Sequence, residues 1–170
     1  LSDFYNKDYF GTNLRITEIQ SFAGLEQLKD LKGVQIKREK MSKSYFHVIS
    51  KYQNYIYSYF PLTNIKCAWY RFYFFIKTDI KDYQKIRFKI IKNLKRNNLK
   101  SFTGSCPEIY LEKSFKKLKN FKVTRLMNSK ILGETSIALD INHTLTQTQH
   151  KKNALELELV LDGIFKKKRK

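Results

Sequence analysis

The sequence AWYRFYFFI, residues Ala68–Ile76, consists almost entirely of aromatic and aliphatic side chains. Such a run is typical of a strand that is buried on most of both faces. Its strictly apolar part, Phe72–Ile76, is the longest apolar run in the chain at five residues. A membrane-spanning helix needs roughly 20 such residues. We therefore expect a buried central strand here and no membrane-spanning helix.

Helical and strand patterns follow this predicted strand. Asp79–Asn97 carries apolar residues at steps of three and four, with Lys and Arg near its end, and predicts a helix. Ser136–Ile141 alternates apolar and polar residues and predicts a second strand. Lys100–Thr103 fits a third, shorter strand. Ser105–Leu118, with Pro107 in its first turn, predicts another helix.

Two capping boxes mark the first and the last predicted helix. In Thr17–Gln20 and in Thr146–Gln149, the threonine and glutamine side chains are spaced so that each satisfies a free backbone N–H. The first helix is expected to kink at Gly33 and then to resume. The order helix, strand, helix, helix, strand, helix predicts an α/β fold, an α+β small domain in which a linker helix precedes a short sheet covered by helices.

The chain is strongly basic. It has 34 basic and 15 acidic residues among 170, a net charge of +19. Clustered Lys and Arg would neutralise phosphates and favour a nucleic-acid partner. However, Lys outnumbers Arg 27 to 7, and the residues encoded by A- and T-rich codons (Lys, Asn, Ile, Tyr, Phe) make up 78 of 170. We therefore favour solvated surface lysines, and a basic terminal tail at Lys166–Lys170 (KKKRK), over a nucleic-acid patch.

The remaining composition indicates a folded cytoplasmic protein. Hydrophobic residues make up 42% of the chain, enough for a core. Two cysteines are too few for a disulfide scaffold, and the first residues lack the pattern of a signal peptide. Because the chain begins with Leu1 and not Met, we expect it to be processed or to be the downstream part of a longer protein.

A nucleophilic cysteine and a zinc site are two chemistries that the residues themselves suggest. Cys106 precedes a predicted helix, where its pKa could be lowered, and His143 or His47 could serve as its base. No supporting spacing surrounds Cys106, so a structural thiol is the favoured interpretation. The cysteines and histidines are too scattered for a zinc site.

Two further patterns have a chemical and a structural interpretation. Glu108 and Glu112 would share one helix face, as paired carboxylates for acid–base chemistry or as part of a solvated charged face. Gly11-Thr12-Asn13 precedes the first capped helix and would contact a phosphate there or form a plain turn. The structural interpretation is favoured for both patterns when they are taken alone.

Four blocks in order along the sequence form a larger pattern than any single motif. They are GTNLRITEIQSFAGLEQLKDL (Gly11–Leu31), KCAWYRFYFFI (Lys66–Ile76), GSCPEIYLEKSF (Gly104–Phe115) and LGETSIALDINHTLT (Leu132–Thr146). Together they resemble the DegT/StrS family of PLP-dependent sugar aminotransferases. The first block resembles the family's Gly-x-Asn-x-Arg-Met-Thr-Glu-Ile-Gln motif, with Ile16 in place of Met. The last two blocks are similar to those of one subgroup.

The resemblance implies the C-terminal part of a fold-type-I enzyme that uses pyridoxal 5'-phosphate (PLP). Such an enzyme moves an amino group from an amino acid, such as glutamate, to a keto-sugar nucleotide for polysaccharide or deoxyamino-sugar biosynthesis, as a cytoplasmic homodimer. In the family the Schiff-base lysine, the acidic partner of the pyridine nitrogen and most of the phosphate cup lie upstream of the first block. Only twelve residues precede Asn13 here. We therefore expect no catalytic residue in this chain, and no activity from the chain alone.

The same resemblance divides the chain into four parts. Residues 1–15 would be the tail of the large PLP-binding domain, and residues 16–60 would be an interdomain helix and connection. Residues 61–165 would form the small C-terminal domain, and residues 166–170 a basic tail.

Some site residues carry over from the family by position. Asn13 resembles the asparagine that reaches across the dimer to the PLP phosphate, and Arg15 its neighbouring arginine. Asn142 stands where the family has His, which puts any role of that His in doubt here. The positions that would line the substrate side are Gly104, Ser105, Glu108, Glu134 and Thr135.

Two other functions remain as alternatives. The net charge of +19 would suit a basic nucleic-acid-binding module. A non-functional truncated product would instead expose its dimer-contact helix and aggregate.

Overall fold

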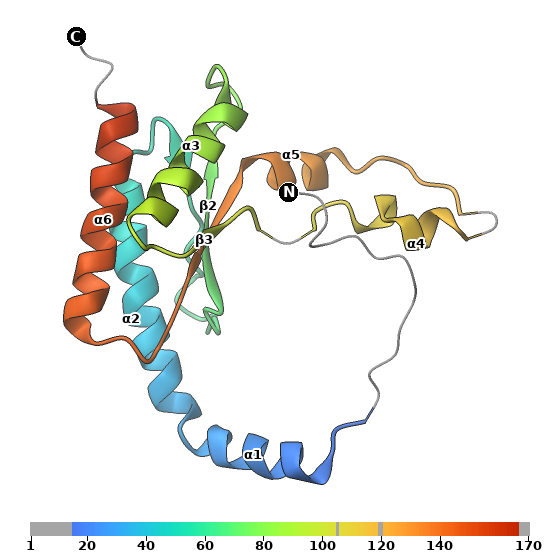
Figure 1. The fold of residues 1–170 in the computed structure, drawn as a ribbon, viewed down its shortest axis with the longest axis vertical. Coiled ribbons are helices and arrows are strands. Elements are labelled where there is room, and N and C mark those ends of the chain that lie inside the picture. The colour runs from blue at the N-terminus through green and yellow to red at the C-terminus, as the bar shows by residue number, and fades with distance from the viewer. Residues whose placement is uncertain (1–14, 105, 119–120, 167–170) are drawn as a thin grey trace.

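A computed structural model describes residues 15–104, 106–118 and 121–166. Its sheet has the strand order β1-β2-β4-β3, and every neighbouring pair is antiparallel (Figure 1). The strands are β1 (Ile56–Tyr57), β2 (Arg71–Ile76), β3 (Ser101–Phe102) and β4 (Ser136–Asp140). The helices are α1 (Glu18–Lys29), α2 (Leu31–Ser50), α3 (Tyr83–Arg96), α4 (Lys113–Lys116), α5 (Met127–Thr135) and α6 (Gln147–Phe165), with a 3-10 turn at Ile109–Leu111. The structure thus confirms the predicted small sheet with helices packed on it.

The central strand β2 lies within the predicted stretch, but only one of its faces is fully buried. Phe72 and Phe74 have no exposed surface, whereas Tyr73 and Phe75, on the other face, are partly exposed. The expected burial is therefore complete on one face and partial on the other. The reason is that α2, α3 and α6 gather around a single core on one side of the sheet (Figure 1).

The predicted first helix consists of two helices with different environments. The chain breaks at Asp30, which ends α1 and begins α2, and not at Gly33. No residue of α1 is buried, although Ile19 is 84% and Phe22 66% exposed. The second half of α2 packs into the core through residues that include Tyr45. The apolar pattern therefore describes two surfaces, of which only the second is covered within the described residues.

The elements after β2 agree in part with the sequence patterns. Helix α3 begins at Tyr83, four residues later than expected, and ends at Arg96, one residue before the predicted end, with Asn97 as its C-cap. β3 confirms the short third strand. The expected helix from Ser105 was wrong: the described part of that segment has only the 3-10 turn and the four-residue α4, which extend away from the sheet (Figure 1). Within the described residues, no helix is both long and apolar enough to cross a membrane.

The two capping boxes provide a matched test of which helices support the core. Both are present, with Thr17 accepting from the Gln20 backbone N–H and Thr146 from that of Gln149. Thr146→Ala should lower the free energy of unfolding by about 1 kcal/mol, because α6 buries part of the core. Thr17→Ala should leave it nearly unchanged, because α1 buries no residue and can fray locally. Urea denaturation followed by circular dichroism measures both, and an equal loss in the two variants would contradict this assignment.

Candidate functional site

Two of the sequence blocks meet in space, at the junction of β3, the loop after it, and the α5–β4 corner. Gly104 has a φ of +91°, and a Cβ there would lie 2.9 Å from the Ser136 Oγ. The Ser136 hydroxyl donates to the Thr103 carbonyl at 2.9 Å. A Cβ on Gly133 would lie 2.3 Å from Cγ of Pro107. Close packing therefore requires both glycines. We call this contact region, formed by Thr103, Gly104, Pro107, Gly133 and Ser136, the motif junction.

A buried arginine on helix α3 donates hydrogen bonds to the motif junction. Arg87 of α3 is 7% exposed, and its Nε donates to the Ser136 carbonyl at 2.8 Å. Its Nη2 donates to the Thr103 carbonyl at 2.6 Å. Burial lowers the pKa of Arg87, but arginine remains charged in proteins. Charged donors make stronger hydrogen bonds than neutral ones, so this side chain joins the end of β3 to the start of β4.

The sequence patterns did not single out Arg87, although they contain a signal for it. Arg87 lies on the apolar stripe of α3, whose buried members also include Ile90 and Leu94. A cation on the buried stripe of a helix whose other Lys and Arg side chains are exposed indicates a partner inside the fold. That partner was not predictable, because it is a pair of backbone carbonyls from segments 16 and 49 positions away in the chain.

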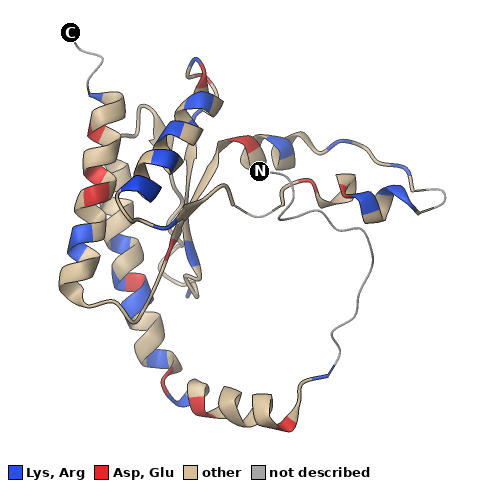
Figure 2. Cartoon of the chain, viewed as in Figure 1, with Lys and Arg blue, Asp and Glu red and all other residues tan. Residues whose placement is uncertain are grey.

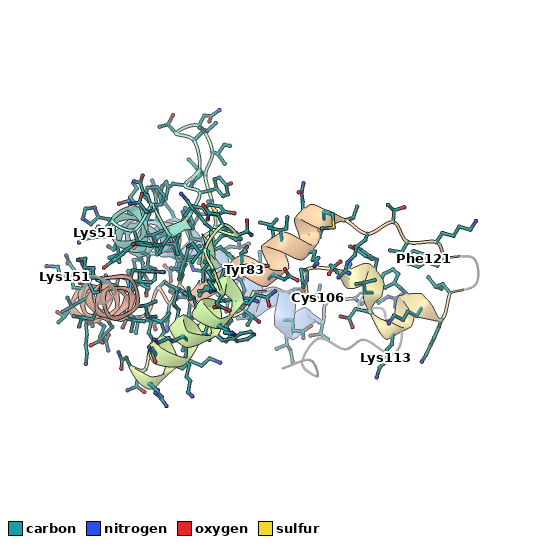
Figure 3. The ribbon with its side chains drawn as sticks, turned by 90° about the horizontal axis from the view of Figure 1, so that it is seen from above. Lys51, Tyr83, Cys106, Lys113, Phe121 and Lys151 are labelled. Atoms are coloured by element: carbon teal, nitrogen blue, oxygen red, sulfur yellow. The ribbon has the colours of Figure 1, made fainter. Side chains whose placement is uncertain are left out.

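The predicted site residue Glu134, next to this junction, has two partners within the described residues. The hydroxyl of Tyr83, which is labelled in Figure 3, donates to Glu134 Oε2 at 2.9 Å. This hydrogen bond raises the pKa of Tyr83. Lys130, one turn earlier on α5, lies 3.9 Å from the other carboxylate oxygen. Thr135 is buried and donates to the Ile131 carbonyl within the helix, so its described role is structural.

The predicted site residue Glu108 is held by a two-point ion pair. Arg125 Nε and Nη2 lie 3.0 and 3.1 Å from its two carboxylate oxygens. The Tyr110 hydroxyl donates to Glu108 Oε1 at 2.9 Å. Because these donors favour the charged form, they hold the pKa of Glu108 below its usual value. Glu108 therefore fixes the path of its loop and, in this arrangement, is not a free acid or base.

Cys106 and Glu112 form a separate contact. The Cys106 thiol donates to Glu112 Oε1 at 3.0 Å. Burial and the neighbouring carboxylate raise the pKa of Cys106 to about 11, so the thiol is protonated at neutral pH. Since the thiolate is the nucleophile, the structural interpretation of Cys106 is favoured. Glu108 and Glu112 have different partners, which also argues against a paired acid–base function.

The sheet face opposite the helices is aromatic and borders the motif junction. Tyr57 stacks on Phe75 with ring centroids 5.3 Å apart. A shallow groove of about 640 Å³ runs over this face beside Tyr59, Tyr70 and Tyr73. Tyr73 Cε1 also lies 3.5 Å from the Cβ position of Gly104, so the groove and the junction are continuous.

The cofactor-binding positions lie elsewhere or outside the described residues. Asn13 is not among the described residues. The same holds for Ser105 of the substrate-lining set and for most of the basic tail. Arg15 is exposed and precedes α1, which lies away from α5 and β4 in Figure 1. No lysine in the described residues is buried, and none of their His, Cys, Asp and Glu side chains form a group of three that could hold a metal ion. The described side chains therefore do not build a PLP site by themselves.

The basic residues do not collect on one element. Figure 2 shows Lys and Arg spread over α2, α3 and α6, with acidic residues among them on α2 and α6. Such mixing favours solvated surface lysines over a dedicated nucleic-acid patch.

Comparison with known proteins identifies the family to which the motif blocks belong. The family model described as the DegT/DnrJ/EryC1/StrS aminotransferase family matches residues 2–156. The chain belongs to this family. Among curated proteins, none matches it significantly.

Several solved structures share the fold. An aminotransferase from Psychrobacter cryohalolentis is 28% identical, with a TM-score of 0.76 over 92% of this chain and 42% of its own. PseC of Helicobacter pylori, an aminotransferase involved in the biosynthesis of pseudoaminic acid, is 21% identical, with a TM-score of 0.72 over 91% of this chain and 40% of its own. The E. coli GDP-4-keto-6-deoxy-D-mannose-3-dehydratase with bound hydrated PLP is 21% identical, with a TM-score of 0.66 over 86% of this chain and 36% of its own. The chain therefore spans about two-fifths of the length of these enzymes.

Arg87 provides the first test of the junction. In Arg87→Met the Thr103 and Ser136 carbonyls lose a buried donor, which should lower the free energy of unfolding by about 2–5 kcal/mol. Arg96→Met removes an exposed arginine of the same helix and should cost within about 0.5 kcal/mol. Urea titration measures both variants. Similar losses in the two would show that the Arg87 hydrogen bonds do not hold the junction.

The two cysteines provide an internal comparison of thiol reactivity. Cys67 is exposed, whereas Cys106 is half-buried with a pKa raised to about 11. At pH 8 we expect iodoacetamide to modify Cys106 at least about tenfold more slowly than Cys67, because little Cys106 thiolate is present. Peptide mass spectrometry over time measures both rates in one sample. Faster modification of Cys106 would instead indicate an activated thiol.

Proposed function

We propose that this chain is the C-terminal part of a PLP-dependent aminotransferase that moves an amino group from an amino acid, glutamate first, to a keto-sugar nucleotide. The product would serve polysaccharide or deoxyamino-sugar biosynthesis in the cytoplasm. The observation that carries the proposal is the family match over residues 2–156. It is supported by an aminotransferase structure that is 28% identical and covers 92% of this chain. When bound, PLP supplies an aldehyde that carries the amino group and a ring that withdraws electrons.

We propose that the chain needs the PLP-binding part of the enzyme for activity. Its described residues hold no buried lysine to bind the PLP aldehyde, and it spans 42% or less of each of the three structures compared above. In the proposed division, residues 1–15 end the PLP-binding domain and residues 16–60 connect the domains. Residues 61–165 form the small domain and residues 166–170 its tail. From the first of these parts, Asn13 and Arg15 would contact the cofactor.

The motif junction is proposed to support the substrate side of the small domain. Gly104 permits close approach of the backbone, and Glu108 and Glu134 are held by Arg125 and Tyr83. These contacts would fix the loop that also contains Ser105 and the helix end that contains Thr135. Residues of this set would therefore shape the substrate edge, and no proton transfer is assigned to them.

The homodimer is proposed from the exposed apolar surface of α1. Ile19 is 84%, Phe22 66%, Leu25 61% and Leu28 60% exposed, and no residue of this helix is buried. An apolar surface of this kind is typical of an interface. We propose that the PLP-binding domain and the second subunit cover α1, which would place the neighbouring Asn13 at the cofactor phosphate of that subunit.

Domain exchange tests the proposed function. In the Psychrobacter aminotransferase, the C-terminal two-fifths would be replaced by this chain, and the purified chimera would be compared with the 170-residue chain alone. We expect the chimera to bind PLP and to convert glutamate to 2-oxoglutarate in a single turnover, and the chain alone to do neither. Asn13→Ala in the chimera should weaken PLP binding about tenfold, since it removes hydrogen bonds to a charged phosphate.

Controls distinguish the possible results of this exchange. Asn54→Ala, in an exposed turn, should leave PLP binding unchanged. A folded chimera that binds no PLP would overturn the proposal, as would PLP binding by the chain alone. Because a sugar dehydratase shares the fold, the assay also follows loss of water from the keto-sugar nucleotide. Dehydration without net amino transfer would overturn the assignment as a transaminase.

A further inference from the structure

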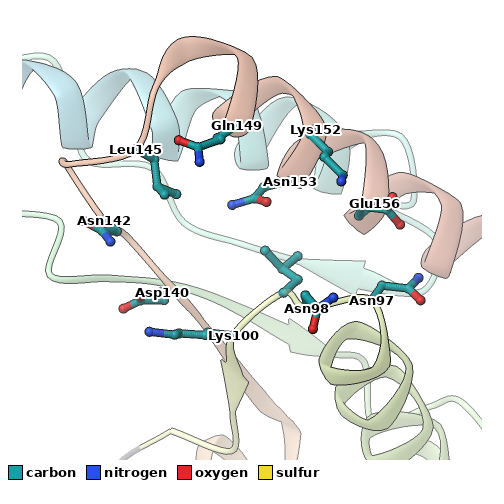
Figure 4. Close-up of a pocket in the computed structure, with 11 residues that line it drawn as sticks. Asn97, Asn98, Lys100, Asp140, Asn142, Leu145, Gln149, Lys152, Asn153 and Glu156 are labelled. Carbon is teal, nitrogen blue, oxygen red and sulfur yellow. The ribbon is translucent and has the colours of Figure 1, made fainter.

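A polar pocket lies at the end of β4 that is remote from the motif junction. Its volume is about 320 Å³, and it is bounded by the segment between α3 and β3, the end of β4 with the loop after it, and the first half of α6 (Figure 4). Asp140, the last residue of β4, lines it, whereas Ser136, the first, lies in the junction. A strand rises about 3.3 Å per residue, so the two ends are about 13 Å apart. The family match assigns no role to this pocket.

Amide side chains from three segments converge on the pocket. Asn97 and Asn98 follow α3, Asn142 follows β4, and Gln149 and Asn153 lie on α6 (Figure 4). The Asn142 oxygen accepts from the Thr144 N–H at 2.9 Å, and the Gln149 oxygen accepts from the Thr146 N–H at 2.8 Å. Their NH2 groups remain as donors. Asn97 and Asn98 make no side-chain hydrogen bond within the described part of the chain and can offer both donors and an acceptor. Asn153 also lies within reach of the Tyr45 hydroxyl, so part of its amide already faces that group.

A buried hydroxyl stands behind the pocket. Tyr45 has no exposed surface, and among the described residues its OH has no hydrogen-bond partner of normal geometry. It is close enough to Asn153 and Asp140 for both to influence its pKa, which burial raises, so it remains a donor at neutral pH. An unsatisfied buried hydroxyl carries a free-energy cost unless a polar group reaches it. Tyr45 does not itself line the pocket, but its hydroxyl lies behind two residues that do, Asp140 and Asn153.

The pocket is balanced in charge although the chain is not. Lys100 and Lys152 face Asp140 and Glu156, which gives no net charge, whereas the whole chain has +19. Neither an anion nor a cation gains from such a balance. The amides instead match hydroxyl groups, which both donate and accept, and Leu145 offers an apolar contact for carbon atoms. The volume is at the lower end of about 300–1,000 Å³ for ligand pockets, which suits one sugar ring but not a nucleotide.

We propose that this pocket binds a neutral polyhydroxylated molecule of monosaccharide size. The proposal does not depend on transaminase activity. The pocket would let the small domain hold a second carbohydrate, as an effector or as part of a larger acceptor, on the side away from the motif junction.

The test uses the full 170-residue chain, labelled with ¹⁵N, and D-glucose as the probe. Glucose should cause saturable shifts of the side-chain amide signals that line the pocket, with a Kd of about 1–10 mM, as expected for a few hydrogen bonds to a small ligand. Asn153→Ala should raise the Kd about tenfold, because it removes one amide that donates and accepts. Asn64→Ala, in an exposed loop outside the pocket, is the matched control and should leave the Kd unchanged.

A fold control and two contradicting outcomes complete this test. Backbone signals outside the pocket report whether Asn153→Ala is folded, and Asn142→Ala provides a second variant. Glucose shifts that stay linear, or that are equal in the Asn153→Ala and Asn64→Ala variants, would overturn the proposal. Saturable shifts with inorganic phosphate or glutamate but not with glucose would overturn the ligand class.

Discussion

The antiparallel pairing of β2 with β4 is the constraint on which the other features depend. It runs from Arg71 opposite Asp140 to Phe75 opposite Ser136, and it sets Phe72 beside Leu139 and Phe74 beside Ile137. These pairs form the sheet side of the core, onto which α2, α3 and α6 pack. The same pairing places Ser136 at one end of β4 and Asp140 at the other. It therefore separates the motif junction from the polar pocket.

Arg87 adds a polar contact to this otherwise apolar framework. At the start of β4, beyond its pairing with β3, the carbonyls of Thr103 and Ser136 lie close together. Burying them unpaired would cost free energy. The guanidinium supplies donors to both. The Ser136 carbonyl belongs to one sequence block of the family and the Thr103 carbonyl directly precedes another, so the arginine links both blocks to helix α3. At and beside the junction, the carboxylates of Glu108 and Glu134 already have hydrogen-bond partners.

Two surfaces of the chain are more apolar than an isolated domain requires. These surfaces are α1, which buries nothing, and the aromatic sheet face beside Tyr73. Both are consistent with a chain that covers about two-fifths of the length of its structural neighbours. In the proposed function, this part of the enzyme would provide shape, and the proposed cofactor contacts would come from the segment that precedes α1.

Local patterns in the sequence determined the two capping boxes, the central strand, α3 and the short β3, because their signals come from residues within a few positions of one another. The motif blocks likewise identified the family. Only the tertiary structure decided which face of β2 is buried, that the segment after Gly104 does not form a long helix, and that Arg87 holds Ser136. It alone brought Asn98 and Asn153 to one pocket. Each of these features depends on contacts between segments far apart in the chain, whose free energies exceed local preferences and leave no periodic signal in the sequence.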